Sequence, residues 1–207
     1  MGTETEIKLE VTSQEQLDRA LEDLRRKACL AGPFIPTQME TVYYDTAQCI
    51  LSRKRWTLRL RKEGDVSVAT LKIPLSGQGG LSVRGEWQCR AGSIEEAIPG
   101  LLQAGAPAHL CQLLDGEELQ PLCGARFTRQ AAPLCFPDGS QAELAVDKGV
   151  LTGSGREQEF CEVELELLAG APEAMTQLAD YLARTYQMAG QPLSKFARAR
   201  DMVQSQW

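Results

Sequence analysis

Four charged side chains alternate with apolar ones in the first residues of the chain: Glu4, Glu6, Lys8 and Glu10. If residues 3–11 form a strand, these four share one face, because successive side chains on a strand point to opposite sides. Carboxylates two residues apart then lie roughly 6.5 Å from each other and repel by about 2.5 kcal/mol at an effective dielectric constant near 20. A sheltered face with this spacing would bind a cation, whereas the solvated outer face of an antiparallel sheet would need none.

The same alternation returns in five further segments, which favours the sheltered face over the solvated one. The charged or polar faces carry Arg59 and Arg61; Thr70 and Lys72; Arg84, Glu86 and Gln88; Glu143 and Asp147; and Glu162, Glu164 and Glu166. Carboxylates dominate the first segment and the last two, and basic groups dominate the middle ones. Two opposed charge sets on a shared face predict a site for both metal ions and a polyanion. The apolar faces must then point outward and be covered by helices, so the sheet would enclose a charged lumen, unlike a small barrel filled with side chains.

Charge, hydropathy and cysteine content restrict the class of protein. The net charge of −6 makes nucleic-acid binding an unfavourable interpretation, despite the clustered Arg and Lys. No apolar run approaches the ~20 residues that span a membrane, and no signal segment precedes the first expected strand. The seven cysteines are odd in number and form no CxxC pair. These features predict a cytoplasmic protein with free thiols and no membrane or nucleic-acid partner.

Histidine chemistry is nearly excluded, because His109 is the only histidine of the chain. A zinc site built from histidines and a Ser-His-Asp triad both require a histidine placed among the other chemical groups. A metal held by this chain would therefore have oxygen ligands, which favours Mg²⁺ or Mn²⁺.

The elements that must position these charges form one α+β domain over residues 1–207, with no repeat and no linker. Strands are expected near residues 3–11, 38–46, 55–63, 66–74, 81–90, 124–132, 141–149 and 157–167. Helices are expected near 14–30, 47–52, 93–105, 108–114, 172–188 and 193–204. Ser13 with Gln16 is a capping-box pattern at the start of the first helix. The glycine-rich segment 76–80 is expected to be a loop, and it lacks the lysine of a phosphate-binding P-loop.

Taken in order, the short motifs resemble the CYTH, or triphosphate tunnel metalloenzyme, superfamily, and most of all the CYTH domain of bacterial inorganic triphosphatases. They are Glu4-x-Glu6-x-Lys8, Tyr43-Tyr44-Asp45-Thr46, Leu58-Arg59-Leu60-Arg61, Thr70-Leu71-Lys72, Arg84-x-Glu86, Arg126-Phe127-Thr128-Arg129, Glu162-x-Glu164-x-Glu166 and Leu193-Ser194-Lys195-Phe196-Ala197-Arg198. The resemblance implies a closed eight-stranded antiparallel β-barrel, a tunnel with helices packed outside. It also implies hydrolysis of a triphosphate with two divalent ions, Mg²⁺ or Mn²⁺. A helical CHAD domain follows in many relatives and is absent from these 207 residues.

The same resemblance implies a role for each charged residue. Phosphate oxygens would be bound by Lys8, Arg59, Arg61, Lys72, Arg84, Arg129 and Lys195. One metal ion would be bound by Glu162 and Glu164, and a second by Glu4, Glu6 and Asp147. Glu4 or Glu6 would orient the attacking water, beside Lys8 and Lys195 in the catalytic group. The remaining carboxylates on these faces, Glu10, Glu86, Glu143 and Glu166, would tune the basic residues. Arg129 is preferred to Arg126 as the inward-facing arginine, and Lys148 is expected to point outward.

The function expected from these residues is metal-dependent hydrolysis of inorganic triphosphate to pyrophosphate and phosphate. A thiamine triphosphatase or a class IV adenylyl cyclase on the same fold stays an alternative, but each needs an aromatic or apolar platform near the tunnel. Aromatic residues are only 6% of the chain, and no aromatic cluster is visible on the charged faces. A non-catalytic polyphosphate-binding module is the alternative from another class, and it would not need both acidic sets. The partner is thus a small triphosphate, and the chain is expected to be a monomer or a homodimer.

Overall fold

The chain folds into a closed antiparallel β-barrel surrounded by helices. The computed structural model describes residues 2–26, 30–78 and 81–204, so Cys29 and the Gly79-Gly80 pair lie outside the described residues. The strands are β1 (Gly2–Glu10), β2 (Ile35–Thr46), β3 (Thr57–Glu63), β4 (Val66–Gln78), β5 (Leu81–Arg90), β6 (Leu119–Cys135), β7 (Gln141–Gly153) and β8 (Arg156–Ala169). They close in the order β1-β5-β4-β3-β2-β6-β7-β8, and every neighbouring pair is antiparallel. The expected fold class is confirmed.

Several strands are longer than the sequence pattern indicated. The strand expected near 124–132 is the longer β6, which continues through Pro121 and Pro133, although a proline cannot donate a ladder hydrogen bond. In the structure Pro133 pairs with Glu143, while Pro121 pairs with Tyr44 next to a register shift that leaves Leu122 unmatched. The loop expected at 76–80 is also wrong for 76–78, which continue β4 after a second shift between Pro74 and Ser76. Bulges of this kind let a strand continue past a residue that breaks regular pairing.

The helices are α1 (Gln14–Arg26), α2 (Ile50–Arg53), α3 (Ile94–Gln103), α4 (His109–Leu113), α5 (Glu173–Tyr186) and α6 (Lys195–Gln204). The expected cap of α1 is confirmed: the Ser13 hydroxyl accepts the amide N–H of Gln16 at 3.1 Å. The Gln16 side chain in turn accepts the amide N–H of Thr12 at 2.9 Å. The first bond satisfies a donor that the first helical turn leaves without a partner, and the second ties the residue before the cap to the helix.

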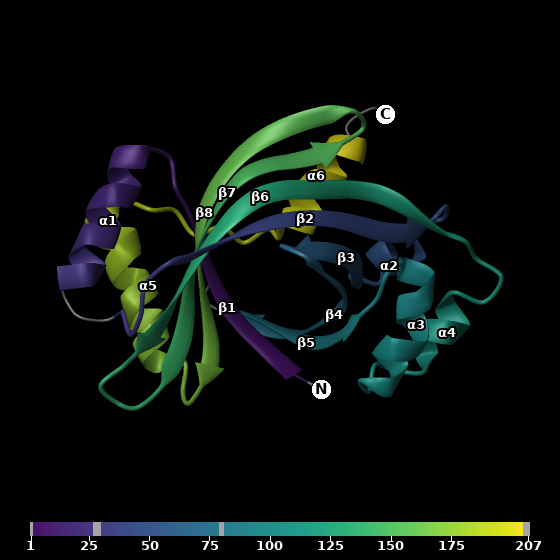
Figure 1. Cartoon of the computed structure of the whole chain (residues 1–207), viewed down its shortest axis with the longest axis horizontal. Coiled ribbons are helices and arrows are strands. Elements are labelled where there is room, and N and C mark those ends of the chain that lie inside the picture. Colours follow the sequence, from purple (N-terminus) through teal and green to yellow (C-terminus); the bar gives the residue numbers. More distant parts are fainter. Residues whose placement is uncertain (1, 27–29, 79–80, 205–207) are drawn as a thin grey trace.

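Two apolar clusters fill the space between the barrel and its helices, as the outward apolar faces predicted. One lies under α1 and α5 and includes Leu21, Leu24, Leu144 and Leu165. The other lies under α2, α3 and α4, on the outer face of β3, β4 and β5. Figure 1 shows these two helical layers on opposite sides of the barrel. Burying each large side chain contributes roughly 1.5–3 kcal/mol. Because these two clusters hold most of the buried apolar side chains, the main apolar core lies outside the barrel.

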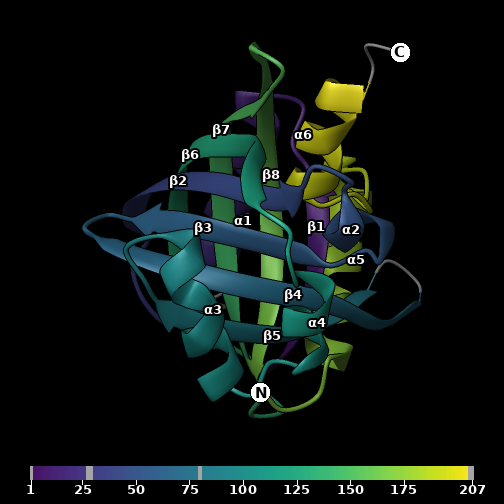
Figure 2. The same ribbon diagram turned by 90° about the vertical axis from the view of Figure 1, so that its right-hand side faces the viewer.

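A third apolar cluster lies inside the barrel, at the end that α6 closes. It joins Tyr43, Phe127, Phe160 and other inward-facing side chains of β2, β6, β7 and β8 to Phe196 and Ala199 of α6. The helix stands at one end of the barrel, clear of the strands β3 to β5 that cross the front of Figure 2. None of the helices within the described ranges is both long and apolar enough to span a lipid bilayer.

Gly149 leaves room for the close approach of β6 to β7, where it is directly opposite Phe127, and this gives a test of the barrel. A Cβ atom at this position would overlap the carbonyl oxygen of Arg126 and lie 2.5 Å from the Cα atom of Phe127. We expect Gly149→Ala to lower the free energy of unfolding by about 2–3 kcal/mol, because backbone atoms must shift to accept the methyl group. Urea denaturation measures this change. The neighbouring exposed residue is the control: Lys148→Ala should change stability by less than about 0.5 kcal/mol. Equal stability of the two variants would contradict the close approach of the two strands.

Candidate functional site

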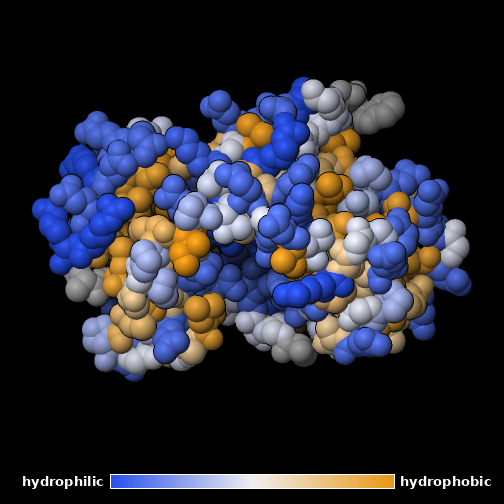
Figure 3. Space-filling view, in the orientation of Figure 1, coloured by the Kyte–Doolittle hydropathy of each residue, from blue (hydrophilic) through white to orange (hydrophobic). Residues whose placement is uncertain are grey.

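A charged cavity of about 180 Å³ lies inside the barrel. In the space-filling view it is a hydrophilic hollow near the centre of the molecule (Figure 3). All seven basic residues that the sequence singled out line it: Lys8, Arg59, Arg61, Lys72, Arg84, Arg129 and Lys195. Glu4, Glu6 and Glu164 line it as well. The structure therefore brings the charged faces of separate strands together around one space inside the barrel.

Strand register places acidic and basic side chains opposite each other on the inner face. Glu4 pairs with Arg84 between β1 and β5, and Lys8 pairs with Glu164 between β1 and β8. Lys72 and Glu86 are opposite each other on β4 and β5. Directly opposite residues share a face and have Cβ atoms about 5 Å apart, close enough for ion pairs. The alternation within each strand and the register between strands together build the lining.

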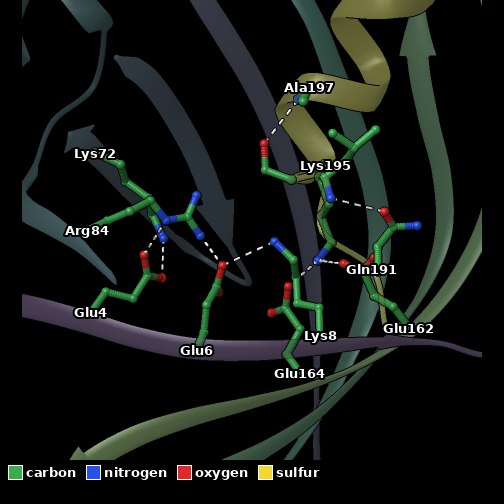
Figure 4. Close-up of polar contacts among 12 residues, drawn as sticks. Glu4, Glu6, Lys8, Lys72, Arg84, Glu162, Glu164, Gln191, Lys195 and Ala197 are labelled. Carbon is green, nitrogen blue, oxygen red and sulfur yellow. Dashed lines mark hydrogen bonds and ion pairs between the residues drawn. The ribbon is translucent and has the colours of Figure 1, made fainter. Parts of the chain in front are cut away.

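The carboxylates of β1 are held by three cations at one side of the cavity (Figure 4). Glu4 forms ion pairs with Lys72 and with Arg84, whose Nε atom lies 3.2 Å from a Glu4 oxygen. Glu6 forms an ion pair with Arg84 and accepts a hydrogen bond from the Lys8 ammonium, whose Nζ atom lies 3.2 Å from Glu6 Oε1. Burial lowers the pKa of Lys72, and the nearby Arg59 lowers it further. For Arg84 burial acts in the same direction, but the Glu6 and Glu4 carboxylates outweigh it and raise its pKa.

A second group of carboxylates lies where β7 and β8 meet α6. Asp147, Glu162 and Glu164 each offer an oxygen atom within 4.8 Å of the others, and no other group of three potential metal ligands occurs in the described part of the chain. Asp147 and Glu162 are both 0% exposed. Burial raises the pKa of Glu162. Burial acts in the same direction on Glu164, but the charges of Lys195 and Arg129 hold the pKa of that carboxyl well below its usual value.

Three cations neutralise this carboxylate group. The Lys195 ammonium lies 2.6 Å from Asp147 and 2.9 Å from Glu164, and it also contacts Glu162. Arg129 binds both oxygens of Asp147, at 2.8 and 2.7 Å, and contacts Glu164. The third cation is the guanidinium of Arg198 on α6, which contacts Glu162. Ser194 caps this helix by accepting the amide N–H of Ala197 at 3.1 Å, which directs the adjacent lysine into the cavity.

The carboxylate group fits a divalent ion. Three carboxylate oxygens from rigid strands match the hard oxygen ligands that Mg²⁺ and Mn²⁺ prefer. The sequence placed Asp147 with Glu4 and Glu6, whereas the structure places it with Glu162 and Glu164. The reason is the register, because Asp147 is directly opposite Glu162 across β7 and β8.

Two arginines of β3 are buried with few carboxylates near them. The Nε atom of Arg59 has no hydrogen-bond partner within the described residues. Arg61 donates to the Thr41 hydroxyl at 3.0 Å and lies 3.8 Å from Glu63. Burial together with the adjacent Arg59 charge lowers the pKa of Arg61 to about 10. A buried guanidinium that is incompletely paired is stabilised by any anion that enters the cavity.

The choice between two arginines of β6 is resolved in favour of Arg129. Arg126 is exposed and pairs with Glu157, while Arg129 lines the cavity. Lys148 points outward, as expected, and donates to Gln14 at 3.0 Å. Glu10 was expected to tune the basic residues of the cavity. It is instead exposed at the end of β1 and lies outside the cavity lining.

Sequence reasoning missed the aromatic side chains of the inner face. Tyr43 and Phe196 have ring centroids 5.1 Å apart, and Phe127 and Phe160 have centroids 5.7 Å apart. The expectation of no aromatic cluster on the charged faces is therefore wrong. Each ring comes from a different strand or helix, so no single segment shows the cluster. Arg198 was also missed as a charge partner, although it stands three residues after Lys195, one helical turn away.

A family model described as the CYTH domain matches residues 2–199. The chain belongs to the CYTH domain family. An inorganic triphosphatase from Haemophilus influenzae is 30% identical over 128 residues, which are 62% of this chain and 35% of that protein. The CYTH chain thus covers about a third of this curated relative.

Solved structures show the same fold at low identity. A Hippeastrum protein described as a candidate adenylyl cyclase with a dominant triphosphatase activity is 22% identical, with a TM-score of 0.63. The match covers 97% of this CYTH chain and 96% of that one. A Pyrococcus horikoshii protein is 18% identical with a TM-score of 0.58, over 96% of this chain and 98% of that one. At these identities the likeness supports the tunnel fold alone.

Glu166 gives the cavity a dependence on pH that can be measured. Burial, together with the Glu4 charge, raises its pKa from 4.5 to about 7. Between these values the folded CYTH protein holds a proton that the unfolded chain has released, so this group's contribution to stability falls as the pH rises. Its size is about 3 kcal/mol at most, at 1.36 kcal/mol for each pH unit. In EDTA, Glu166→Gln should therefore be the more stable protein at pH 8 and should show a flatter stability curve between pH 5 and 7. Parallel urea-denaturation curves for the two proteins would contradict the shift.

Proposed function

We propose that this CYTH protein is a metal-dependent inorganic triphosphatase that cleaves triphosphate to pyrophosphate and phosphate. The observation that carries the proposal is the single cavity that collects seven basic side chains from five strands and one helix. A triphosphate carries several negative charges and needs cations along its whole length before water can attack it. The name of the Haemophilus influenzae relative supports the same chemistry.

The arginines of β3 are the first candidates for binding phosphate oxygens. Arg59 and Arg61 are buried and lie on the cavity wall, and the Nε atom of Arg59 has no hydrogen-bond partner among the described residues. A planar guanidinium binds two phosphate oxygens at once, whereas a lysine ammonium acts as a point charge. Lys8, Lys72, Arg84 and Arg129 would exchange a carboxylate partner for a phosphate oxygen when the anion enters.

A divalent ion would be held by Asp147, Glu162 and Glu164. When bound, the ion polarises a phosphoryl group and lowers the pKa of a nearby water. The second ion stays a prediction, because Glu4 and Glu6 are separated from this group and are paired with Lys72, Arg84 and Lys8. We assign to Glu4 the orientation of the attacking water, with Glu6 supporting Lys8.

The closed end of the tunnel favours a bare polyphosphate over a nucleotide or thiamine triphosphate. Tyr43, Phe127, Phe160 and Phe196 are all less than 9% exposed, because they cover one another and are covered by α6. Phe127 and Phe160 therefore fill space. Tyr43 and Phe196 line the cavity, but each exposes too little of its ring to stack on a base or a thiazolium ring. An organic substituent would have to stay at the open mouth. A non-catalytic binding module is the weaker alternative, because it has no need for the buried carboxylates of both β1 and β8.

A substrate panel tests the proposed activity. Phosphate release from tripolyphosphate, ATP and thiamine triphosphate is measured with Mg²⁺, with Mn²⁺ and with EDTA. We expect the highest turnover with tripolyphosphate, and none in EDTA. Tight binding of tripolyphosphate without turnover under any metal would favour the binding module, and preferred cleavage of ATP or thiamine triphosphate would favour the other two enzymes.

Arg59 and Arg126 form a matched pair for testing the anion site. Arg59→Ala should weaken tripolyphosphate binding by about 10- to 100-fold, because a charged hydrogen bond contributes roughly 1.5–3 kcal/mol. Arg126→Ala removes the same charge from the outer face of the barrel and should change the affinity less than about twofold. Calorimetric titration in EDTA measures both without hydrolysis. Similar losses in the two variants would show that binding depends on overall charge and not on the cavity.

Glu4→Gln tests the assignment of the water-orienting group. The substitution keeps the shape of the side chain and removes its negative charge. We expect turnover of tripolyphosphate to fall at least about 100-fold, as for loss of a general base, with binding largely retained. Steady-state kinetics separate the two quantities. An equal loss of affinity and turnover would mean that Glu4 acts through Lys72 and Arg84 and does not act on the water.

A further inference from the structure

The Lys195 ammonium occupies the centre of the only three-carboxylate group found among the described residues. It lies 2.6 Å from Asp147 and 2.9 Å from Glu164, and it contacts Glu162. The side chain is 6% exposed, so water does not replace these contacts. A cation bound by all three carboxylates would need the position that this ammonium holds.

The charges around this position already balance. Three carboxylates, those of Asp147, Glu162 and Glu164, face three cations, those of Lys195, Arg129 and Arg198. Adding a divalent ion would place two further positive charges in a buried site. Like charges at such distances repel strongly when water is excluded. One of the cations must therefore leave the carboxylates when a metal ion binds.

Lys195 is the cation whose displacement needs the smallest change in structure. Its charge is a compact ammonium on a flexible stem, whereas Arg129 is fixed by two parallel hydrogen bonds to Asp147. The ammonium also lies 5.0 Å from the ring centroid of Phe127 and 5.4 Å from that of Phe160. These rings stabilise the ammonium in its position beside the carboxylates, where its three ion pairs are the contacts that a metal ion would replace. Since Lys195 lines the cavity, rotation about its own side-chain bonds can carry the charge inward while α6 stays in place.

We propose that Lys195 is an internal counter-ion that holds the metal position of Asp147, Glu162 and Glu164 until a divalent ion displaces it into the cavity. The displaced ammonium keeps its proton and becomes available to an anion, so metal binding and triphosphate binding favour each other. This coupling is reciprocal, as linkage requires. The coupling to triphosphate rests on the proposed function, whereas the exchange between lysine and metal does not.

The direct test is the affinity for Mn²⁺ in the absence of any phosphate compound, measured by calorimetric titration. Lys195→Met keeps much of the length of the side chain and removes the competing charge, so it should bind Mn²⁺ at least tenfold more tightly than the unaltered protein. Lys148→Met is the matched control, because Lys148 is adjacent to Asp147 in sequence but points outward to Gln14. Its Mn²⁺ affinity should be unchanged. An unchanged or weaker affinity in Lys195→Met would overturn the proposal, and so would an equal gain in both variants.

A second measurement needs no substitution and covers the case in which Lys195→Met does not fold. A small acylating reagent is applied to the unaltered protein in EDTA and in saturating Mn²⁺, and peptide mass spectrometry follows each lysine. Labelling of Lys195 should rise several-fold in Mn²⁺, because its ammonium leaves the carboxylates, while labelling of exposed Lys148 stays constant. Binding of Mn²⁺ without any change at Lys195 would overturn the exchange.

These readouts separate this proposal from the triphosphatase activity. An inactive protein whose Lys195→Met variant binds Mn²⁺ more tightly would refute the proposed function and keep the exchange. An active triphosphatase whose Mn²⁺ affinity is unaffected by Lys195→Met would refute the exchange and keep the function.

Discussion

Buried charge is the constraint on which the rest of this structure depends. The strands place ionised side chains on the inner face, and removing each ion from water costs several kcal/mol unless a partner restores the interaction. Glu4, Glu6 and Glu164 are accordingly paired with cations from neighbouring strands or from α6. Because most of the lumen is ionic, the apolar core has to form between the barrel and its helices. The two outer clusters are therefore a consequence of the charged interior, and they supply the stability that the interior does not.

The ion pairs within the lumen contribute little to the stability of the fold. They hold charged groups in positions where a polyanion and metal ions can replace their partners. Buried ion pairs are often no more stabilising than well-packed apolar residues of similar volume. Here the pairs keep opposite charges close together in the free protein, and a polyanion with metal ions can exchange with them group by group. Arg59, with its unpartnered Nε atom, marks where the exchange has the least to displace. This arrangement sacrifices stability for a preorganised site, as functional sites commonly do.

Alternation along single strands was enough to predict most of the charged side chains that line the cavity, although Glu10 at the exposed end of β1 is an exception. It assigned Arg129 inward and Lys148 outward, and both assignments are confirmed. Contacts between strands were beyond that signal, because they depend on register. Asp147 thus joined Glu162 and not Glu4, and the prolines of β6 were absorbed by a long strand with a bulge. The aromatic cluster was invisible for the same reason, since each of its rings comes from a different element.

The last helix links the closure of the tunnel to its charge. Phe196 and Ala199 fill one end of the barrel, and Lys195 and Arg198 of the same helix neutralise Glu162. These residues are spaced so that one turn of helix presents an apolar group and a cation to the lumen together. Detaching the helix would expose aromatic rings and leave buried carboxylates without partners at the same time. The two costs add, so α6 is held to the barrel by charge and by packing. Because Lys195 is the first residue of α6, a change in the charge of Asp147, Glu162 or Glu164 alters the contacts at the start of this helix directly.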